Sequence, residues 1–277
     1  MKFAIFSIML LLSTISTVLS QTAILITYNI RYNNENDGIN AWPNRKYQVT
    51  DLLRFHEADI IGLQEVLYDQ ITDVSLQLPG FDQVGVGRDD GNAAGEYSPI
   101  FYNSRKYQLK EHGWFWLSET PDFPSLGWDA ACKRICTYVL LEDYDKRKSV
   151  WVFNTHFDHL GNEARINSAQ LIMRKIDTLN TRNFPVVLMG DFNLTPESKP
   201  IERIETVFYD SKKVSQQVPY GPEGTFNDFD FNSELKNRID YIFVKGKIDI
   251  IKYGVLTDSN EQHYPSDHLP VLVEIEL

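Results

Sequence analysis

The segment Pro185-Val-Val-Leu-Met-Gly-Asp-Phe-Asn193 joins a short apolar run to two polar residues. The run Val186–Met189 is rich in β-branched residues and lies between Pro and Gly, as buried strands do. Asp191 and Asn193 follow where this strand should end. A polar group at a strand end is held rigidly by the core while its head faces a cleft. The segment therefore predicts a strand that presents reactive groups at one edge of a sheet.

Similar runs, rich in Val, Ile, Phe and Tyr, recur along the chain and are bounded by Gly, Pro, Asn or Asp. Helical patterns are fewer: Trp42–Phe55 and Glu163–Leu179 place apolar residues at spacings of three and four. Many strands with a few intervening helices favour an α/β or α+β layered sandwich. The further predicted strands are Ala23–Asn29, Ile60–Leu63, Pro99–Tyr102, Trp114–Leu117, Ile135–Leu141, Val150–Asn154, Ile239–Val244 and Leu269–Ile275.

Acids, amides and histidines gather at the ends of these runs. Each alone has an ordinary structural explanation, because Asn favours turns, acids cap helices and a lone His is often a structural residue. Their recurrence instead favours a site for a hard cation together with acid–base groups, since Mg²⁺ prefers oxygen ligands and imidazoles stabilise charge on a phosphoryl group. The residues are Asn29, Glu65, His156, Asp158, Asp191, Asn193, Asp240, Asp267 and His268.

The chain lacks the defining motifs of several other enzyme classes. It contains no Gly-rich Walker loop, no Gly-x-Ser-x-Gly, no His-Glu-x-x-His and no Gly-x-Gly-x-x-Gly. The P-loop, α/β-hydrolase, zincin and dinucleotide-binding interpretations therefore have no support in the sequence.

Six short motifs together resemble, in their order, those of the endonuclease/exonuclease/phosphatase superfamily, which has the fold of pancreatic deoxyribonuclease and exonuclease III. The resemblance runs from about residue 24 to 275. It implies an α/β (α+β) fold of four layers, with two packed mixed β-sheets flanked by helices. The motifs are Thr-Tyr-Asn29-Ile-Arg, Gly-Leu-Gln-Glu65-Val, Asn-Thr-His156-Phe-Asp, Met-Gly-Asp191-Phe-Asn193, Arg238-Ile-Asp240-Tyr-Ile and Ser266-Asp267-His268-Leu-Pro.

The resemblance implies a metal site. Glu65 would be the principal ligand of Mg²⁺, with Mn²⁺ as an alternative ion, and Asn29 would lie close to the metal and the phosphate. Asp267 would be a further acid that can reach a metal. The exonuclease III branch has an Asp two residues after the first Asn, whereas this chain has Arg31, like the pancreatic branch. We therefore expect one firmly bound ion, and a second ion stays an open question.

The resemblance also implies catalytic roles. Asp191 would orient or deprotonate the attacking water, and Asn193 would hold the phosphate or that water. Asp240 and His268 would form a hydrogen-bonded pair whose imidazole contacts the scissile phosphate. His156 occupies the position of a second phosphate-facing residue. The reaction implied is hydrolysis of a phosphate ester by an activated water.

The segments Gly95–Tyr102 and Leu117–Tyr138 resemble a bacterial subgroup of the superfamily that includes sugar-phosphate phosphatases. Arg134 lies in the second segment, and we expect it either to bind the substrate phosphate or to form an ordinary ion pair, since Arg recognises phosphate bidentately. The substrate expected is a small phosphorylated metabolite or sugar. A secreted nuclease is the alternative, followed by a sphingomyelinase-type phosphodiesterase and a catalytically silent binding module.

The charge of the chain bears on these alternatives. With 27 Lys and Arg against 38 Asp and Glu, the formal net charge is −11. Nonspecific nucleic-acid binding depends on neutralising phosphates with basic side chains. The charge thus disfavours a nonspecific nucleic-acid binder, although a nuclease with a locally positive cleft is still compatible with it.

The first 20 residues resemble a secretory signal peptide, with Lys2, an apolar run and small residues near Ser20. We expect export to the periplasm or medium, a mature domain over residues 21–277 and no stable membrane anchor. Cys132 and Cys136 flank the start of a predicted strand, where four residues span about 13 Å, too far for a disulfide. Two free thiols are therefore expected. The sequence favours neither a monomer nor an oligomer.

Overall fold

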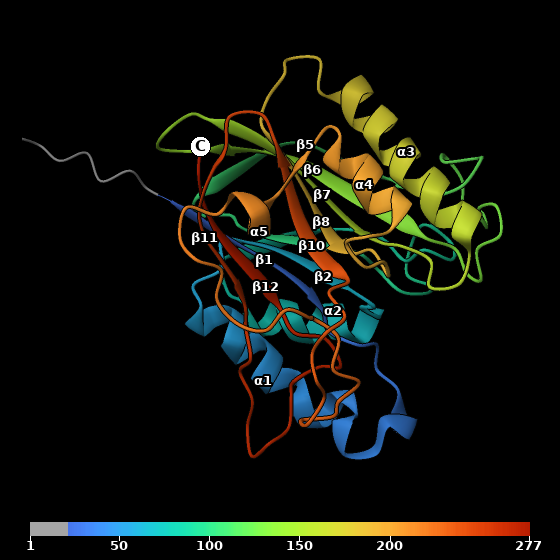
Figure 1. The fold of residues 1–277 in the computed structure, drawn as a ribbon, viewed down its shortest axis with the longest axis vertical. Helices are drawn as coiled ribbons and strands as arrows, with labels where there is room; N and C mark the ends of the chain where they lie inside the picture. Colours follow the sequence, from blue (N-terminus) through green and yellow to red (C-terminus); the bar gives the residue numbers. More distant parts are fainter. Residues whose placement is uncertain (1–21) are drawn as a thin grey trace, which may run out of the picture.

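The computed structural model describes residues 22–277. The predicted signal peptide, residues 1–20, lies outside the described residues. Within residues 22–277, no helix has both the length and the apolar character needed to cross a membrane. Two six-stranded sheets form the centre of this part of the chain, and helices lie on both sides of the pair (Figure 1).

The first sheet is built from strands at both ends of the described chain. Its central pair, β1 and β2, is parallel, and its other neighbouring strands are antiparallel, so the sheet is mixed. In spatial order its strands are β11 (Asp249–Val255), β12 (Val271–Glu276), β1 (Ala23–Asn29), β2 (Ile60–Gln64), β4 (Ile100–Asn103) and β3 (Phe81–Val84).

The second sheet repeats this plan. Its central pair, β7 and β8, is parallel, and the remaining neighbours are antiparallel. In spatial order its strands are β5 (Tyr107–Trp116), β6 (Ile135–Asp143), β7 (Ser149–His156), β8 (Val186–Asp191), β10 (Asp240–Lys245) and β9 (Tyr209–Asp210).

The helices cover the outer face of each sheet, and this arrangement confirms the predicted four layers (Figure 1). On the first sheet, apolar residues of α1 (Trp42–Phe55) and α2 (Tyr68–Gln77) pack against β1 and β2. On the second, α3 (Asn162–Leu179) and α4 (Lys199–Glu205) pack against β7 and β8. A third apolar cluster fills the space between the sheets. A 3₁₀ helix, η1 (Glu35–Asn40), and the short α5 (Ser211–Val214) complete the elements.

The topology brings the predicted site residues to one edge of the sandwich. Parallel strands β1 and β2 end together, as do β7 and β8, whose last residues His156 and Asp191 are paired in register. Strands β10 and β12 run antiparallel to their neighbours, so their beginnings lie at these same ends, with Asp240 paired to Asp191. Residues before β12, including His268, enter at this edge as well.

The two sheets approach each other closely just below this edge. A Cβ atom at Gly62 would lie 2.7 Å from the Met189 side chain and 2.8 Å from Asn154 Oδ1. The Gln64 amide donates to Asn154 Oδ1 at 2.7 Å across the gap, and Asn154 Nδ2 donates to Pro99 O at 2.8 Å. Buried hydrogen bonds of this kind fix the two sheets against each other. The ends of β2 and β7 are thereby held side by side.

Candidate active site

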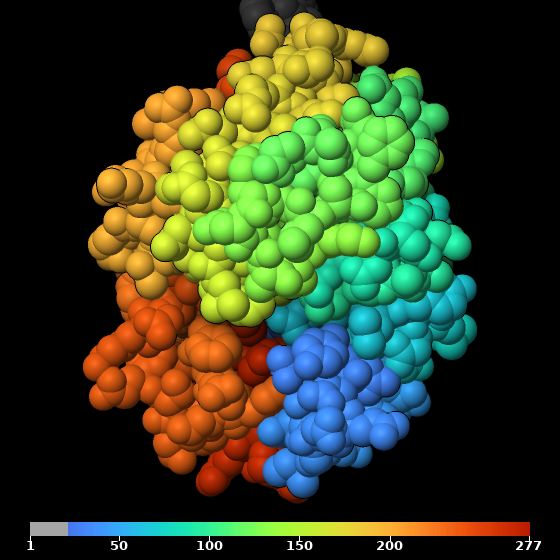
Figure 2. Space-filling view, turned by 90° about the vertical axis from the view of Figure 1, so that its right-hand side faces the viewer, coloured from blue at the N-terminus to red at the C-terminus, as the bar shows by residue number. Residues whose placement is uncertain are grey.

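A pocket of about 530 Å³ opens at this edge. In the space-filling view, blue, orange and yellow-green parts of the chain meet around a hollow, with red C-terminal residues at its floor (Figure 2). All predicted catalytic, metal-binding and substrate-binding residues line the pocket, except Asn29 and Asp240. Those two are fully buried directly behind it. The structure therefore brings the predicted residues together, and their individual roles stay predictions.

Asp191, the last residue of β8, is the centre of the arrangement. Its Oδ2 accepts a hydrogen bond from Asn29 Nδ2 at 3.0 Å and lies 3.3 Å from Nε2 of His156 and 3.8 Å from Nε2 of His268. Burial, then the charge of Asp240, raise the pKa of Asp191 to about 7, against the opposing effects of His268 and the Asn29 amide. A carboxyl group with its pKa near neutrality suits general acid–base chemistry.

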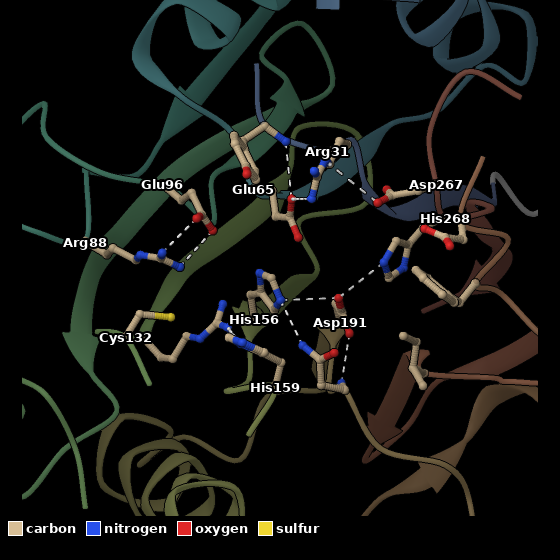
Figure 3. A pocket seen from close by; sticks show the side chains of 16 residues that line it. Arg31, Glu65, Arg88, Glu96, Cys132, His156, His159, Asp191, Asp267 and His268 are labelled. Atoms are coloured by element: carbon tan, nitrogen blue, oxygen red, sulfur yellow. Dashed lines mark hydrogen bonds and ion pairs between the residues drawn. The ribbon is translucent and has the colours of Figure 1, made fainter. Parts of the chain in front are cut away.

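His268 and Asp240 form the predicted pair. Nδ1 of His268 lies 2.9 Å from Oδ2 of Asp240, and the same oxygen accepts a bond from the Thr225 hydroxyl at 2.6 Å. Burial alone would lower the pKa of His268, but Asp240 and Asp191 raise it well above its ordinary value. The two carboxylates therefore favour the protonated form of His268, and its Nε2 is directed toward Asp191 and the pocket (Figure 3).

The pKa of His156 is shifted in the opposite direction to that of His268. It ends β7 and lies 3.0 Å from the Asn193 amide through its Nε2. Burial, and then the charges of Arg134 and Arg88, lower the pKa of His156 well below its ordinary value. The surroundings thus favour the neutral form of His156 and the protonated form of His268. Asn193 is fixed beside them, because its backbone N–H donates to Asp191 Oδ1 at 2.8 Å.

The carboxylates suited to a metal face the pocket on the first-sheet side. Glu65 follows β2, and its oxygens accept bonds from the Asn29 amide at 3.1 Å and the Tyr32 N–H at 3.3 Å. Asp267 is nearly buried, and burial raises its pKa, with Glu65 adding to the effect. The guanidinium of Arg31 lies between them, 3.9 Å from Glu65 and 4.0 Å from Asp267 (Figure 3). Glu65 and Asp267 offer only oxygen ligands, and they already attract the positive charge of Arg31. Such ligands fit a hard divalent cation.

The potential ligand atoms of Asp191, Asp240 and His268 lie within 4.8 Å of one another, and so do those of Cys132, Asp158 and His159. In the first group, Nδ1 of His268 and Oδ2 of Asp240 contact each other, while Asp191 and His268 line the pocket. Glu65 and Asp267 stay the metal ligands that the family resemblance implies.

Arg134 forms the ion pair that was one of the two alternatives expected for it, and its binding to a substrate phosphate stays a prediction. It is buried, and it lines the pocket. Its Nε lies 3.5 Å from Asp158 Oδ2 and its Nη2 lies 3.0 Å from His159 Nδ1. Burial raises the pKa of Asp158, but the backbone N–H groups that it accepts and the Arg134 charge together lower it to about 2. Arg134 is therefore a fixed cation at the pocket wall.

Sequence reasoning missed several residues that line the pocket: Arg88, Glu96, Cys132, His159, Tyr32 and Phe226. Glu96 falls within a segment that the family resemblance had singled out, and His159 follows Asp158 directly, so both positions carried a signal. Cys132 and Cys136 are free thiols, as predicted.

Residues 26–268 match the model of the endonuclease/exonuclease/phosphatase family. The chain belongs to this family. Enzymes of the family hydrolyse phosphate esters and depend on a divalent metal ion, and the protein is accordingly a phosphoesterase.

Solved structures agree with this assignment. The mannosyl-6-phosphatase Bt3783 of Bacteroides thetaiotaomicron is 40% identical to this chain, with a TM-score of 0.89 over 92% of this chain and 100% of its own. A family protein of Bacteroides vulgatus is 41% identical, with a TM-score of 0.89 over 93% of this chain and 99% of its own. Protein L388 of Acanthamoeba polyphaga mimivirus is 28% identical over 258 residues, 85% of this chain and 92% of the relative.

Proposed function

We propose that this protein hydrolyses the phosphate monoester of a sugar, using Mg²⁺ and a water molecule activated by Asp191. The observation that carries the proposal is the position of Asp191 between the imidazoles of His156 and His268, at the floor of a pocket of about 530 Å³. A pocket of this size suits a small phosphorylated molecule. The 40% identical relative named as a mannosyl-6-phosphatase supports a sugar phosphate.

The proposed roles follow from the contacts. Mg²⁺ held by Glu65 and Asp267 would polarise the phosphoryl group and stabilise the leaving oxygen. Asp191 would take a proton from the attacking water, and its pKa of about 7 makes that transfer feasible near neutral pH. The cationic His268 would stabilise the phosphoryl oxygens as negative charge increases on them.

Two residues would act through others. Asp240 would hold the His268 ring in place through the 2.9 Å contact with Nδ1. Asn29 would orient Glu65 and Asp191, because its amide donates to both carboxylates. Since Asn29 is fully buried, it would set the spacing of these two acids close to the metal.

A screen of substrates tests the proposal. The protein with added Mg²⁺ is assayed against sugar phosphates, other monoesters, diesters, nucleic acids and phospholipids, with Asp191→Ala as the inactive control. We expect the highest kcat/KM for a hexose phosphate. A higher value for a nucleic acid or a phospholipid would replace the proposed substrate by the nuclease or sphingomyelinase-type alternative. Turnover in the presence of EDTA would contradict the metal-dependent reaction.

Export is the second part of the proposal, and the composition of residues 1–20 supports it. The test is N-terminal sequencing of the protein recovered outside the cytoplasm. A mature chain beginning near Gln21 is expected, and an intact N-terminus would contradict cleavage.

A further inference from the structure

The pocket extends beyond the residues used in the proposed reaction. Arg88, Glu96, Arg134 and His159 form what we call the far wall, and all four line the pocket. In the close-up, Arg88 and Glu96 lie across His156 from Asp191 and His268 (Figure 3). Nothing in the proposed chemistry requires Arg88 or Glu96.

The far wall is polar but balanced in charge. Arg88 donates from both terminal nitrogens to the two oxygens of Glu96, each at 2.7 Å, and Arg134 is balanced by Asp158. Burial raises the pKa of Glu96, against the opposing charge of Arg88. Two balanced pairs give the wall little attraction for a further anion. It is therefore suited to an uncharged polar group.

The hydrogen-bonding capacity of the far wall is incompletely used. A carboxylate offers about four acceptor positions, and Arg88 occupies two of those on Glu96. Each terminal nitrogen of Arg88 makes one of these bonds and carries a second N–H. A hydroxyl group both donates and accepts. It can therefore donate to Glu96 and accept from Arg88 at the same time.

The loop that carries Arg88 and Glu96 is held rigidly. Arg88 N donates to Glu96 O at 3.1 Å, and the Trp116 indole donates to Arg88 O at 2.7 Å. From the neighbouring loop, Lys133 Nζ donates to Asp89 O at 2.7 Å. The turn needs Gly91, whose φ is +72° and which lies against Trp116. A preorganised wall loses little entropy when it binds a ligand.

We propose that the far wall, through Glu96 and Arg88, binds hydroxyl groups of the alcohol that leaves from the phosphate, and so selects a polyhydroxylated, non-aromatic ester. The proposal rests on the monoesterase function proposed above and adds the residues that choose the substrate. The Phe and Tyr side chains that line the pocket have other partners, since Phe226 packs on His268 at 5.2 Å and the Tyr32 ring lies 4.4 Å from the Arg31 guanidinium. The far wall thus carries no Phe, Tyr or Trp side chain, its one ring being the imidazole of His159, and it offers no apolar surface for an acyl chain.

The test compares two esters and two variants. Glucose 6-phosphate or mannose 6-phosphate supplies hydroxyls, and n-butyl phosphate has a similar leaving oxygen with none. Replacing Glu96 by Gln should lower kcat/KM for the hexose phosphate by about 10- to 100-fold, the effect of losing a hydrogen bond to a charged group. The value for butyl phosphate should change by less than about threefold, within ordinary variation between surface variants.

Asp90→Asn is the matched control. It removes one negative charge from the same loop, and Asp90 is exposed and outside the pocket. Its Oδ1 accepts bonds from Asn92 N and Ala94 N, which an Asn side chain can retain. This variant should process both esters like the wild type.

A second measurement uses the wild-type protein alone, in case Glu96→Gln does not fold. Deoxy analogues of the hexose 6-phosphate, each lacking one hydroxyl, should include at least one whose kcat/KM falls about tenfold or more. Equal losses on both esters in Glu96→Gln, or deoxy analogues that all react like the parent sugar, would overturn the far-wall proposal and leave the monoesterase function intact. If the wild type hydrolyses neither ester, the proposed function fails and the far-wall proposal fails with it.

Discussion

Replacing Asp240 by Asn would test how His268 is held in the active site. The side chain of Asp240 is fully buried and nearly isosteric with Asn, so the change removes a charge without opening a cavity. Its Oδ2 contacts His268 Nδ1 at 2.9 Å and accepts from the Thr225 hydroxyl at 2.6 Å. An amide oxygen can accept both bonds, so the ring should keep its position.

The expected loss of activity can be estimated from this geometry. Exchanging a charge-assisted hydrogen bond for a neutral one removes about 1–2 kcal/mol. Loss of a full charge about 4 Å from the centre of the ring removes at most about 4 kcal/mol at an effective dielectric constant of 20. If His268 stabilises the transition state as a cation, kcat should fall by roughly 10- to 1,000-fold.

The assay is steady-state hydrolysis of the best hexose phosphate with saturating Mg²⁺, together with thermal unfolding. Asp249→Asn, at an exposed residue that begins β11, removes the same charge and should leave kcat unchanged. Wild-type turnover in Asp240→Asn with an unchanged melting temperature would refute the dependence of His268 on Asp240. A lost folding transition would assign the residue a structural role instead.

Three other predictions concern the metal, the buried acid and the sheet interface. Glu65→Gln should raise the Mg²⁺ concentration for half-maximal activity by at least about tenfold, and calorimetric titration should show the same loss of Mg²⁺ affinity. Burial raises the pKa of Asp191 to about 7. Between its ordinary pKa and pH 7, Asp191 is therefore protonated in the native state and ionised in the unfolded state. Its contribution destabilises the metal-free protein increasingly as the pH rises to 7. Asp191→Asn should therefore abolish turnover but raise the melting temperature in EDTA at pH 8 by at least about 2 °C, whereas an unchanged or lower value would contradict the raised pKa. Gly62→Ala should cost about 1–3 kcal/mol of unfolding free energy, measured by urea denaturation, because its new methyl group would lie 2.8 Å from Asn154 Oδ1, which hydrogen bonds hold in place; unchanged stability would contradict the close approach of the sheets.

The central strands could be predicted from the sequence because they are buried on both faces. Parallel strands covered by helices read as continuous apolar runs, and Ala23–Asn29 and the start of β8 have this character. The predicted helix Trp42–Phe55 has the bounds of α1, and the second predicted helix begins one residue later than α3. Strong hydrophobic periodicity made these elements visible.

The helices and strands that the sequence did not predict bury too little apolar surface to produce a periodic hydrophobic pattern. The predicted strand Trp114–Leu117 covers only the last three residues of β5, and the preceding residues Lys110–Gly113 are largely exposed and polar. Helix α2 buries only Ile71 and Val74 among its apolar residues. Strand β11 is an edge strand with partly exposed positions. In each case tertiary packing determines the structure more than local sequence does.

The candidate site could be predicted where its residues end strands that the sequence shows as continuous apolar runs. Glu65, His156 and Asp191 each follow a buried run, so their position at the sheet edge came from the same signal as the fold. Arg88 and Glu96 lie in a loop, and a charged pair in a loop has the same appearance in sequence as a solvated surface pair. Only the fold shows that the 2.7 Å contacts between them form one wall of the pocket.

The unpaired polar atoms around the pocket connect its stability to its function. Arg88 Nε, Arg134 Nη1 and His156 Nδ1 are buried and have no hydrogen-bond partner among the described residues. Leaving a buried polar atom unpaired costs about 1–3 kcal/mol. These atoms are shielded from solvent, so a ligand oxygen can reach them only if neighbouring side chains move. The guanidinium nitrogens are donors only, and a movement that brought one of them to an acceptor oxygen would offset part of this cost. The folded protein thus bears around its pocket a cost that arises from the same charged side chains that shape the pocket wall.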